Sequence, residues 1–490
     1  MNYFNQFRLN RAILWLPILS VVLASCGGGG DSGGPSDTTA PSVTVTSHTD
    51  GQEIIGARTI TLQGTVSSDT QSVTILQNGG NVVAATVSGD TFSVDVTMAD
   101  RNNTFEISAT DTSNNKASTS ITLIYPFLSF NNGQEASMVI GQPDFTSSDP
   151  NRGNTKPSAN SLNTPYGIAL DSSSNLYLND TENNRILVFS EIPSQYDEQA
   201  SDVIGQMDFS TFQSGLSDNS LSYPLVIFVD NDKQFIADTG NSRVLIWSIG
   251  ADQADVVIGQ QNFTTNTNGC SRNTLYIPWG MHIVEHKMIV ADTGNSRVMI
   301  WSEIPTQSGQ DADIVLGQQG FETCAENDSD GDGTSETTPS AHTLAYPAGV
   351  WSDGTRLVVA DTENSRILIW NSFPTKSGQD ADIVLGQSVM TTNSRGTAQD
   401  ALSAPGYIQS NRNQLFITDS ENHRVLIWDA FPAQNNEPAS RVLGYDDFVT
   451  ATPLVTSKTS FSWPSELLVT GDKLLVSDDG FHRVMIFQAP

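Results

Sequence analysis

One short acidic segment has the residue types and spacing that suit a metal ion. Oxygen-bearing side chains alternate along it with small residues, including glycines that permit a sharp turn: Asp328, Asp330, Asp332, Thr334 and Glu336. Because Ca²⁺ takes roughly six to eight hard oxygen ligands, we expect these residues to hold a structural Ca²⁺ ion. The twelfth position counted from Asp328 is Pro339, so the carboxylate expected there is missing. A solvated acidic loop without a metal is the alternative.

Two of the three cysteines fall in long connecting segments of the chain. These are Cys270 and Cys324. In an oxidising compartment such a pair forms a disulfide, and we expect one here. The chain-entropy model gives a stabilisation of about 4 kcal/mol for a loop of this size. Two free thiols are the alternative.

Aromatic residues recur beside six prolines that each open an apolar run. Each of the following lies within two residues of such a proline: Tyr166, Tyr223, Trp279, Tyr346, Tyr407 and Trp463. Exposed rings stack on sugars or hold peptide side chains. We therefore expect these six residues to form a ligand-binding face for a glycan or protein partner of the cell envelope. The alternative is that most of the rings pack inside the fold.

No residue set suggests catalysis with comparable clarity. His282, Glu466 and Asn163 lie near predicted strand starts, but the chain has neither a repeated histidine set nor a nucleophile elbow. We therefore assign no catalytic residue and expect a binding or scaffold protein rather than an enzyme. The alternative is a metal-dependent hydrolase or lyase with its site in a central channel.

The prolines and aromatics belong to a repeated unit. A phrase of the type Asp-Thr-x-Asn-x-Arg recurs six times, starting at Asp180, Asp238, Asp292, Asp361, Asp419 and Asp478. A proline-led apolar run precedes each phrase and a run closing on Phe or Trp follows it, while Val-Ile-Gly-Gln or a variant recurs between units. Four strands per repeat predict a propeller blade. The Asp and Asn suit a tight turn, and we expect each Arg to bond the neighbouring blade.

Pro-x-Gly, Asp-Thr-x-Asn-x-Arg and Ile-Leu-Ile-Trp together resemble the NHL repeat, over residues 136–490. The resemblance implies a six-bladed NHL-type β-propeller, which we place at residues 128–490. The last unit stops at Pro490 after its third strand, whereas an isolated fourth-strand phrase, Met138 to Gln142, precedes the first unit. We therefore expect this N-terminal strand to complete the last blade and remove an open sheet edge.

Residues 41–125 alternate apolar and Ser/Thr residues at period two, in seven short runs separated by turn residues. This pattern predicts a β-sandwich. The segment resembles the bacterial Ig-like domains that space out surface proteins, which implies a spacer, with adhesion as the alternative. The expected fold class is all-β, with an Ig-like β-sandwich followed by the six-bladed propeller.

The N-terminus indicates export. Residues 1–25 have a short positive region and an apolar run too short to span a bilayer, as in a signal peptide. Leu23 to Cys26 resembles the lipobox of bacterial lipoproteins, which implies that Cys26 carries a lipid. Residues 26–40 form a Gly-rich tether. The residue after the cysteine is Gly27, which in such lipoproteins favours the outer membrane. An ordinary signal peptide that contains a cysteine is the alternative.

The charge limits the possible partners. The formal net charge is −31, spread along the chain without long runs. Such a surface repels phosphates, which excludes nucleic acid and anionic lipid as ligands of the folded part. We therefore expect a membrane contact through the lipid anchor only, on either the periplasmic or the outer surface.

We predict that Cys26→Ala abolishes lipid anchoring and leaves the protein uncleaved or soluble. The native protein and the control Ser32→Ala should partition into the detergent phase in a detergent phase-separation assay. A native protein found wholly in the aqueous phase would contradict the assignment of Cys26.

Overall fold

The computed structural model describes residues 37–452 and 455–489. The predicted signal peptide at residues 1–25, Cys26 and most of the tether therefore lie outside the described residues. Strands and short 3₁₀ turns make up the described secondary structure. In this part of the chain, no helix is both long enough and apolar enough to cross a membrane.

Residues 43–125, which we name the two-sheet module, form two four-stranded sheets. One sheet has the order β1-β2-β6-β5: Val43–Val45, Thr59–Val66, Thr91–Thr97 and Thr86–Ser88. The other has the order β4-β3-β7-β8: Asn81–Ala84, Thr70–Gln77, Arg101–Asp111 and Lys116–Tyr125. Buried residues alternate along β2 and β7 and form one core, which includes Leu62 and Phe105. The period-two pattern of the sequence arises from this one-sided burial.

The rest of the described chain forms six four-stranded antiparallel sheets, numbered here 1 to 6 by their first strands. Sheet 1 contains β10 Pro165–Leu170, β11 Leu176–Asp180, β12 Arg185–Phe189 and β13 Asp202–Ile204; sheet 2 contains β14 Pro224–Asp230, β15 Lys233–Asp238, β16 Arg243–Ser248 and β17 Val256–Ile258. Sheet 3 contains β18 Pro278–Val284, β19 Lys287–Asp292, β20 Arg297–Trp301 and β21 Ile314–Leu316; sheet 4 contains β22 Pro347–Ser352, β23 Leu357–Asp361, β24 Arg366–Trp370 and β25 Ile383–Leu385. Sheet 5 contains β26 Pro405–Ser410, β27 Leu415–Asp419, β28 Arg424–Trp428 and β29 Arg441–Leu443; sheet 6 contains β30 Pro464–Thr470, β31 Lys473–Asp478, β32 Arg483–Gln488 and β9 Met138–Ile140.

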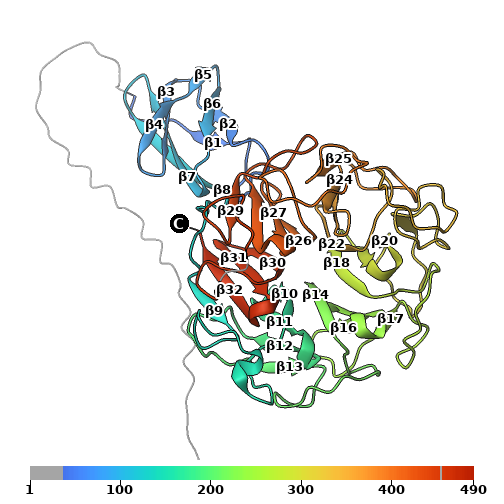
Figure 1. Ribbon diagram of the computed structural model, residues 1–490. Helices are drawn as coiled ribbons and strands as arrows, with labels where there is room; N and C mark the ends of the chain where they lie inside the picture. The colour runs from blue at the N-terminus through green and yellow to red at the C-terminus, as the bar shows by residue number, and fades with distance from the viewer. Residues whose placement is uncertain (1–36, 453–454, 490) are drawn as a thin grey trace, which may run out of the picture.

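The first strands of the six sheets contact one another in cyclic order, from β10 through β14, β18, β22, β26 and β30 back to β10. Figure 1 shows them around a common centre, with the other strands of each sheet farther out. This arrangement is a β-propeller. The predicted closing strand is present, because β9 pairs antiparallel with β32, with Val139 opposite Met485. The fourth strand of sheet 6 therefore comes from the start of the propeller sequence.

A buried ion pair stabilises the turn between the second and third strands of every sheet. In sheet 3, Arg297 Nε lies 2.7 Å from Asp292 Oδ2, and both side chains are fully buried. The Arg297 guanidinium also donates to the carbonyls of Ser271 (2.9 Å) and Phe321 (2.7 Å), in the segments that enter and leave the sheet. The expectation that each Arg bonds the neighbouring blade was wrong. Asp292 and Arg297 are direct cross-strand partners, so the Arg reaches the carboxylate of its own sheet first.

Hydroxyl groups provide the bonds between neighbouring sheets instead. In five sheets, the residue after the Asp donates its hydroxyl to the carbonyl of the proline that opens the next sheet, over 2.6–2.8 Å: Thr181, Thr239, Thr293, Thr362 and Ser420. Sheet 6 has Asp479 at this position. No bond from Asp479 to the Pro165 carbonyl is found among the described residues, where Ser465 Oγ lies 3.5 Å from that carbonyl instead. A carboxylate cannot donate to a carbonyl, so only a protonated Asp479 could take the place of the hydroxyl. Burial, reinforced by Asp478, raises the pKa of Asp479 to about 8.

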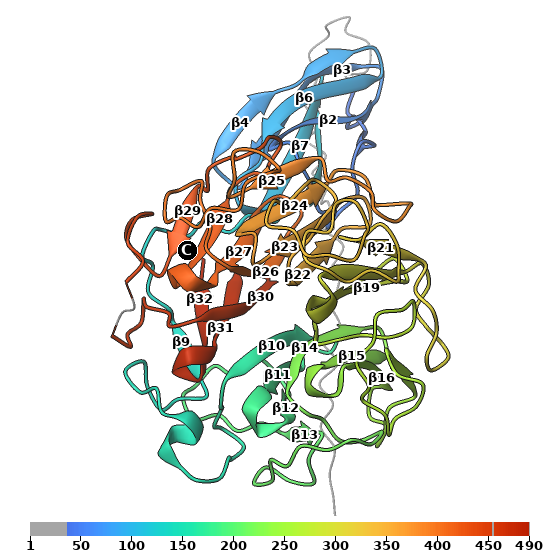
Figure 2. The same ribbon diagram turned by 45° about the vertical axis from the view of Figure 1, so that its right-hand side comes forward.

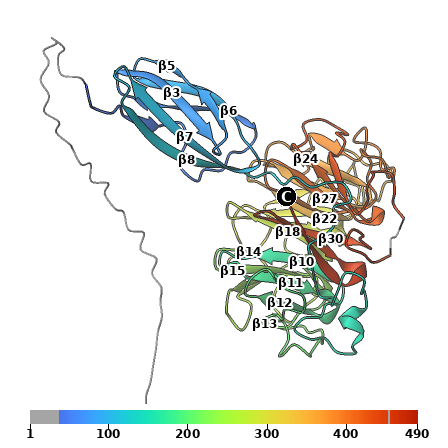
Figure 3. The same ribbon diagram turned by 90° about the vertical axis from the view of Figure 1, so that its left-hand side faces the viewer.

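The two-sheet module contacts sheets 5 and 6 directly. The Gly56 amide donates to Asn413 Oδ1 (2.6 Å), and Asn413 Nδ2 donates to the Ile54 carbonyl (3.3 Å). Arg101 forms an ion pair with Asp472 (3.0 Å), which holds the pKa of Asp472 well below its usual range. Figures 2 and 3 show the module extending from the propeller with the ends of β7 and β8 nearest to it. The module is therefore docked on the propeller through specific polar contacts.

We predict that Asp479→Thr stabilises the propeller, more at pH 8 than at pH 5. The unfolded Asp loses its proton near pH 4, whereas the folded one keeps it to about pH 8. Unfolding therefore releases a proton between these values, and stability falls as the pH rises from about 4 to about 8. Threonine restores a neutral hydroxyl donor and should remove this part of the pH dependence.

The measurement is the melting temperature at several pH values. The control is Asp90→Thr, at an exposed carboxyl group in the two-sheet module, which should leave the pH dependence unchanged. Equal slopes for Asp479→Thr and the native protein would refute this account of Asp479.

Candidate functional site

The six predicted binding residues lie at the end of the propeller where the Asp turns are. Each opening proline is the cross-strand partner of the Asp of its sheet, as Pro224 is of Asp238. Three of the six rings are well exposed: Tyr223 (39%), Tyr346 (41%) and Trp463 (38%). Trp279 is half-buried. Tyr166 and Tyr407 are buried, so their predicted place on the binding face was wrong.

The three exposed residues each precede the opening proline by one position. They come from sheets 2, 4 and 6, so they alternate around the ring. Tyr223 and Tyr346 have φ values of 53° and 48°, in the left-handed region that non-glycine residues rarely adopt. Side chains of the preceding sheet hold this backbone: the Tyr223 amide donates to Asn184 Oδ1 (2.8 Å), and the Tyr346 amide donates to Ser296 Oγ (3.3 Å). The rings therefore extend from backbone with little freedom to move.

Carboxylates lie beside these rings. The pKa of Tyr223 is raised by partial burial, then by Glu182, and then by Asp479, which is charged at the high pH where a tyrosine titrates. The pKa of Tyr346 is raised by partial burial and then by Glu326. The two exposed tyrosines therefore each have a glutamate carboxylate nearby, which can accept hydrogen bonds.

The two buried tyrosines belong to the centre of the ring. Tyr166 of β10 meets Trp279 of β18 edge-on, with ring centroids 5.6 Å apart, although β14 lies between these strands in the cyclic order. Tyr407 lies beside Glu466, whose carboxyl is buried and whose Oε2 atom has no hydrogen-bond partner within the part of the chain that the structure describes. Burial raises the pKa of Glu466 well above its usual range. Residues that follow the opening proline thus turn inward, whereas those that precede it can face outward.

His282 and Asn163 do not join Glu466 in a common site. His282 is packed edge-on against Phe228, with ring centroids 5.0 Å apart, and burial lowers its pKa to about 4. The Asn163 amide donates to Asp180 Oδ1 (2.6 Å), as part of a repeated turn. Each of these two residues therefore interacts with its own neighbours rather than with Glu466.

Three of the five predicted calcium ligands come together. Carboxylate oxygens of Asp328, Asp330 and Asp332 lie within 4.8 Å of one another. Asp328 is buried, and its carboxylate accepts the amides of Gly331 (2.8 Å) and Gly333 (3.0 Å). Of the other two predicted ligands, Glu336 lies outside this cluster and accepts a bond from Ser329 Oγ (2.7 Å), whereas Thr334 is exposed.

A second carboxylate cluster was not predicted. It contains Asp37, Asp69 and Asp111 of the two-sheet module and its N-terminal approach. Asn115 Nδ2 donates to Asp111 (2.8 Å) and to the Asp37 carbonyl (3.1 Å), which brings the segments together. Because these aspartates are far apart in the sequence, no local spacing indicates the cluster.

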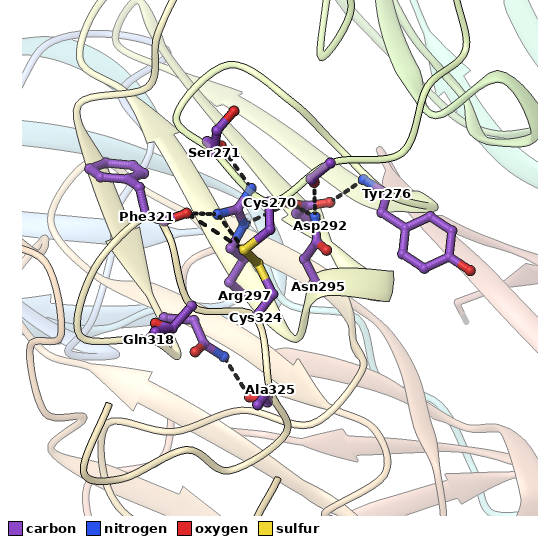
Figure 4. The surroundings of a disulfide bond; sticks show 12 residues. Cys270, Ser271, Tyr276, Asp292, Asn295, Arg297, Gln318, Phe321, Cys324 and Ala325 are labelled. Carbon is purple, nitrogen blue, oxygen red and sulfur yellow. Dashed lines mark hydrogen bonds and ion pairs between the residues drawn. A yellow bond between two sulfur atoms is a disulfide. The ribbon is translucent and has the colours of Figure 1, made fainter. Parts of the chain in front are cut away.

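Cys270 and Cys324 form a disulfide, with their Cα atoms 6.2 Å apart. Figure 4 shows the bond beside Arg297 and Phe321. The two loops that it joins are those to which Arg297 donates. The disulfide therefore adds a covalent link where the buried guanidinium already connects the same loops.

The chain matches no family model and no curated protein. Among solved structures it is similar to a streptogramin B lyase (11% identity, 68% of this chain and 94% of that chain, TM-score 0.37). It is also similar to the PQQ-bound form of an aldose sugar dehydrogenase from Streptomyces coelicolor (14% identity, 68% of this chain and 96% of that chain, TM-score 0.38). A third similar structure is a chain of a nidogen–laminin complex (15% identity, 57% of this chain and 83% of that chain, TM-score 0.34). The strand pairing and the cyclic contacts of the first strands show the propeller fold.

We propose that Ca²⁺ binds the Asp328–Asp330–Asp332 cluster and orders the loop between β21 and β22. EDTA should then lower the melting temperature of the native protein, and Asp330→Ala should remove most of that sensitivity. Asp447→Ala, at an exposed loop carboxylate outside both clusters, should retain it. An EDTA effect that survives Asp330→Ala would assign the ion to another site, and no EDTA effect would reject calcium binding.

Proposed function

We propose that this protein is a non-catalytic binding protein of the cell envelope, tethered by a lipid on Cys26, whose propeller face recognises a neutral glycan. The observation that carries the proposal is the set of three exposed rings, which we name the rim aromatics: Tyr223, Tyr346 and Trp463. They occupy alternate sheets at one end of the ring.

Packing does not account for aromatic residues at these positions. The corresponding residues of sheets 1, 3 and 5 are Thr164, Ile277 and Ala404, all with left-handed φ values of 46–54°. Tyr223 and Tyr346 thus share their backbone conformation with side chains of very different size, whereas Trp463 does not adopt it. Large rings held in the open by a conformation of this kind are typical of a surface that binds.

The surroundings favour a neutral, hydroxyl-rich ligand. Aromatic faces stack on the apolar faces of sugar rings, and the nearby carboxylates of Glu182 and Glu326 accept hydrogen bonds from hydroxyl groups. The net charge of −31 disfavours anionic polymers. A protein partner that presents hydroxyl or basic groups is the other class that such a face suits.

We also propose an identity for each of the two folded parts of the chain. We take the six sheets as NHL-type blades, since each contains the proline, the Asp–Arg turn and the apolar third strand. We take the two-sheet module as an Ig-like spacer domain. The tether at residues 26–40 and the residue Gly27 support an outer-membrane lipoprotein. We propose that it acts on either the periplasmic or the outer side of that membrane.

The double substitution Tyr223→Ala and Trp463→Ala should weaken binding to an array of neutral oligosaccharides by about tenfold or more, because two stacking surfaces are lost. Its circular dichroism and melting temperature should stay close to those of the native protein, since both rings are exposed. The matched control is Tyr196→Ala, which removes a ring of similar exposure (46%) from another part of the surface.

Equal binding by the double variant and the native protein would refute the rim aromatics as the site. Metal-dependent turnover of lactone or ester substrates by the native protein would instead favour a hydrolase or lyase with its site in the channel.

A further inference from the structure

The segment between the third and fourth strands of a sheet also covers the outer edge of the preceding sheet. In sheet 3 this segment places Gly309 and Ser308 over Val257 of β17. The Gly309 amide donates to the Val257 carbonyl (2.9 Å), and Ser308 Oγ accepts the Val257 amide (3.2 Å). Both outward-facing backbone groups of the edge strand are thereby satisfied.

The same covering turn recurs around the ring. Amide donors reach the edge carbonyls in three further places: Gly378 on Val315 (3.0 Å), Asn436 on Val384 (2.8 Å) and Gly133 on Val442 (3.2 Å). The segment of sheet 1 that contains Pro193 and Asp197 lines a small pocket together with Val139 and Ile140 of β9, the edge of sheet 6, without a hydrogen bond to Val139 among the described residues. In the described chain, four of the six outer edges therefore carry a covering amide bond, and a fifth, β9, has a segment beside it without that bond.

The edge of sheet 1 has none, because the segment in sheet 2 is shorter. Eight positions separate Trp247 from Asp255 (255 − 247), whereas twelve separate Trp301 from Asp313 (313 − 301). The Trp247 indole donates to the Ala251 carbonyl (3.0 Å), whereas the Trp301 indole donates to Gln310 (3.1 Å), beyond the covering turn. The missing residues are those that would reach β13.

A groove of about 880 Å³ occupies the place of the missing turn, and we name it the β13 groove. Met207 is 96% exposed there, whereas its counterpart Gln261 lies against the covering residue Gly309. Among the described residues, no backbone amide takes the place of Gly309 on the carbonyl of Val203, the counterpart of Val257. The Val203 amide is bonded only by the adjacent Asp202 side chain (2.8 Å).

The lining of the groove indicates the chemistry of an occupant. Its acidic side chains are Asp202 and Asp252, and none of the described residues that line it is Lys or Arg. Met207, Ile204 and Ile249 provide apolar surface. A second copy of this chain, with its net charge of −31, complements such a groove poorly. A basic segment with apolar side chains complements it well.

We propose that the β13 groove binds an extended segment of a basic partner polypeptide, which adds to sheet 1 as a further strand. A peptide amide donates to the Val203 carbonyl, as Gly309 does to Val257. A peptide carbonyl takes the Val203 amide from Asp202, and the released carboxylate pairs with a Lys or Arg of the peptide. Such strand addition obtains affinity from main-chain bonds and selectivity from alternate side chains. This site is separate from the rim aromatics.

The test measures binding of a fluorescent hexapeptide of alternating Lys and Val to the full-length protein. The key variant replaces Ser248–Asp255 by the sequence of Ser302–Asp313, which restores a covering turn with its own Ser and Gly. It should lose at least about tenfold in affinity, with an unchanged or higher melting temperature. The matched control replaces Ser302–Asp313 by the equally long Asn371–Asp382 and should bind like the native protein.

A second variant tests the proposal without a grafted segment, so that misfolding of the graft cannot explain the result. Asp202→Lys should weaken the Lys-Val peptide and strengthen a Glu-Val peptide, and the native protein should show slower hydrogen exchange at the Val203 amide when the Lys-Val peptide is bound. Unchanged binding by the graft, or no binding by the native protein, would overturn the proposal. Dimerisation of the native protein that the graft abolishes would also overturn it, in favour of a second copy as the occupant.

Discussion

The buried pair of Asp and Arg at each turn is the interaction on which the propeller depends. Both side chains are fully buried in all six sheets. Each carboxylate also accepts the backbone amide just before the first strand, as Asp361 does from Ala345 (2.7 Å). Removal of one partner from a buried pair costs about 3–5 kcal/mol, because the other charge stays buried without compensation. The same turn sets the position of the next opening proline, and with it the rim aromatics.

Much of this architecture could be predicted from the sequence, because repetition makes local signals mutually consistent. The prolines begin the first strands, the Asp phrase forms the turns, and the isolated Met138–Ile140 run completes sheet 6. The pairing of Cys270 with Cys324 followed from their number and their places in connecting loops. These features depend on spacing along the chain, which the sequence displays directly.

The features that the sequence did not predict depend on where side chains point and on which distant segments of the chain come together. Tyr166 and Tyr223 both flank a proline, yet one side chain turns to the centre of the ring and the other to solvent. The arginines bond their own sheets because the hairpin sets Arg297 opposite Asp292. Asp37, Asp69 and Asp111 come together only through the folding of the two-sheet module. The sequence does contain a signal for the β13 groove, because the segment after Trp247 is shorter than its counterparts. That signal can be interpreted only when the structure shows that the longer counterparts cover the edge strands of neighbouring sheets.

The docking of the two-sheet module determines how the protein responds to a mechanical load. A pull on the N-terminal end of the chain is transmitted through the module before it reaches β9, the strand that closes the ring. The bonds between Gly56 and Asn413 and between Arg101 and Asp472 lie in parallel with that path. Gln414, in the loop between β26 and β27 of sheet 5, bonds both the amide (2.6 Å) and the carbonyl (2.9 Å) of Leu128, which lies along the chain between the module and β9. The force is thus divided among sheets 5 and 6, and the three-residue strand β9 does not carry it alone.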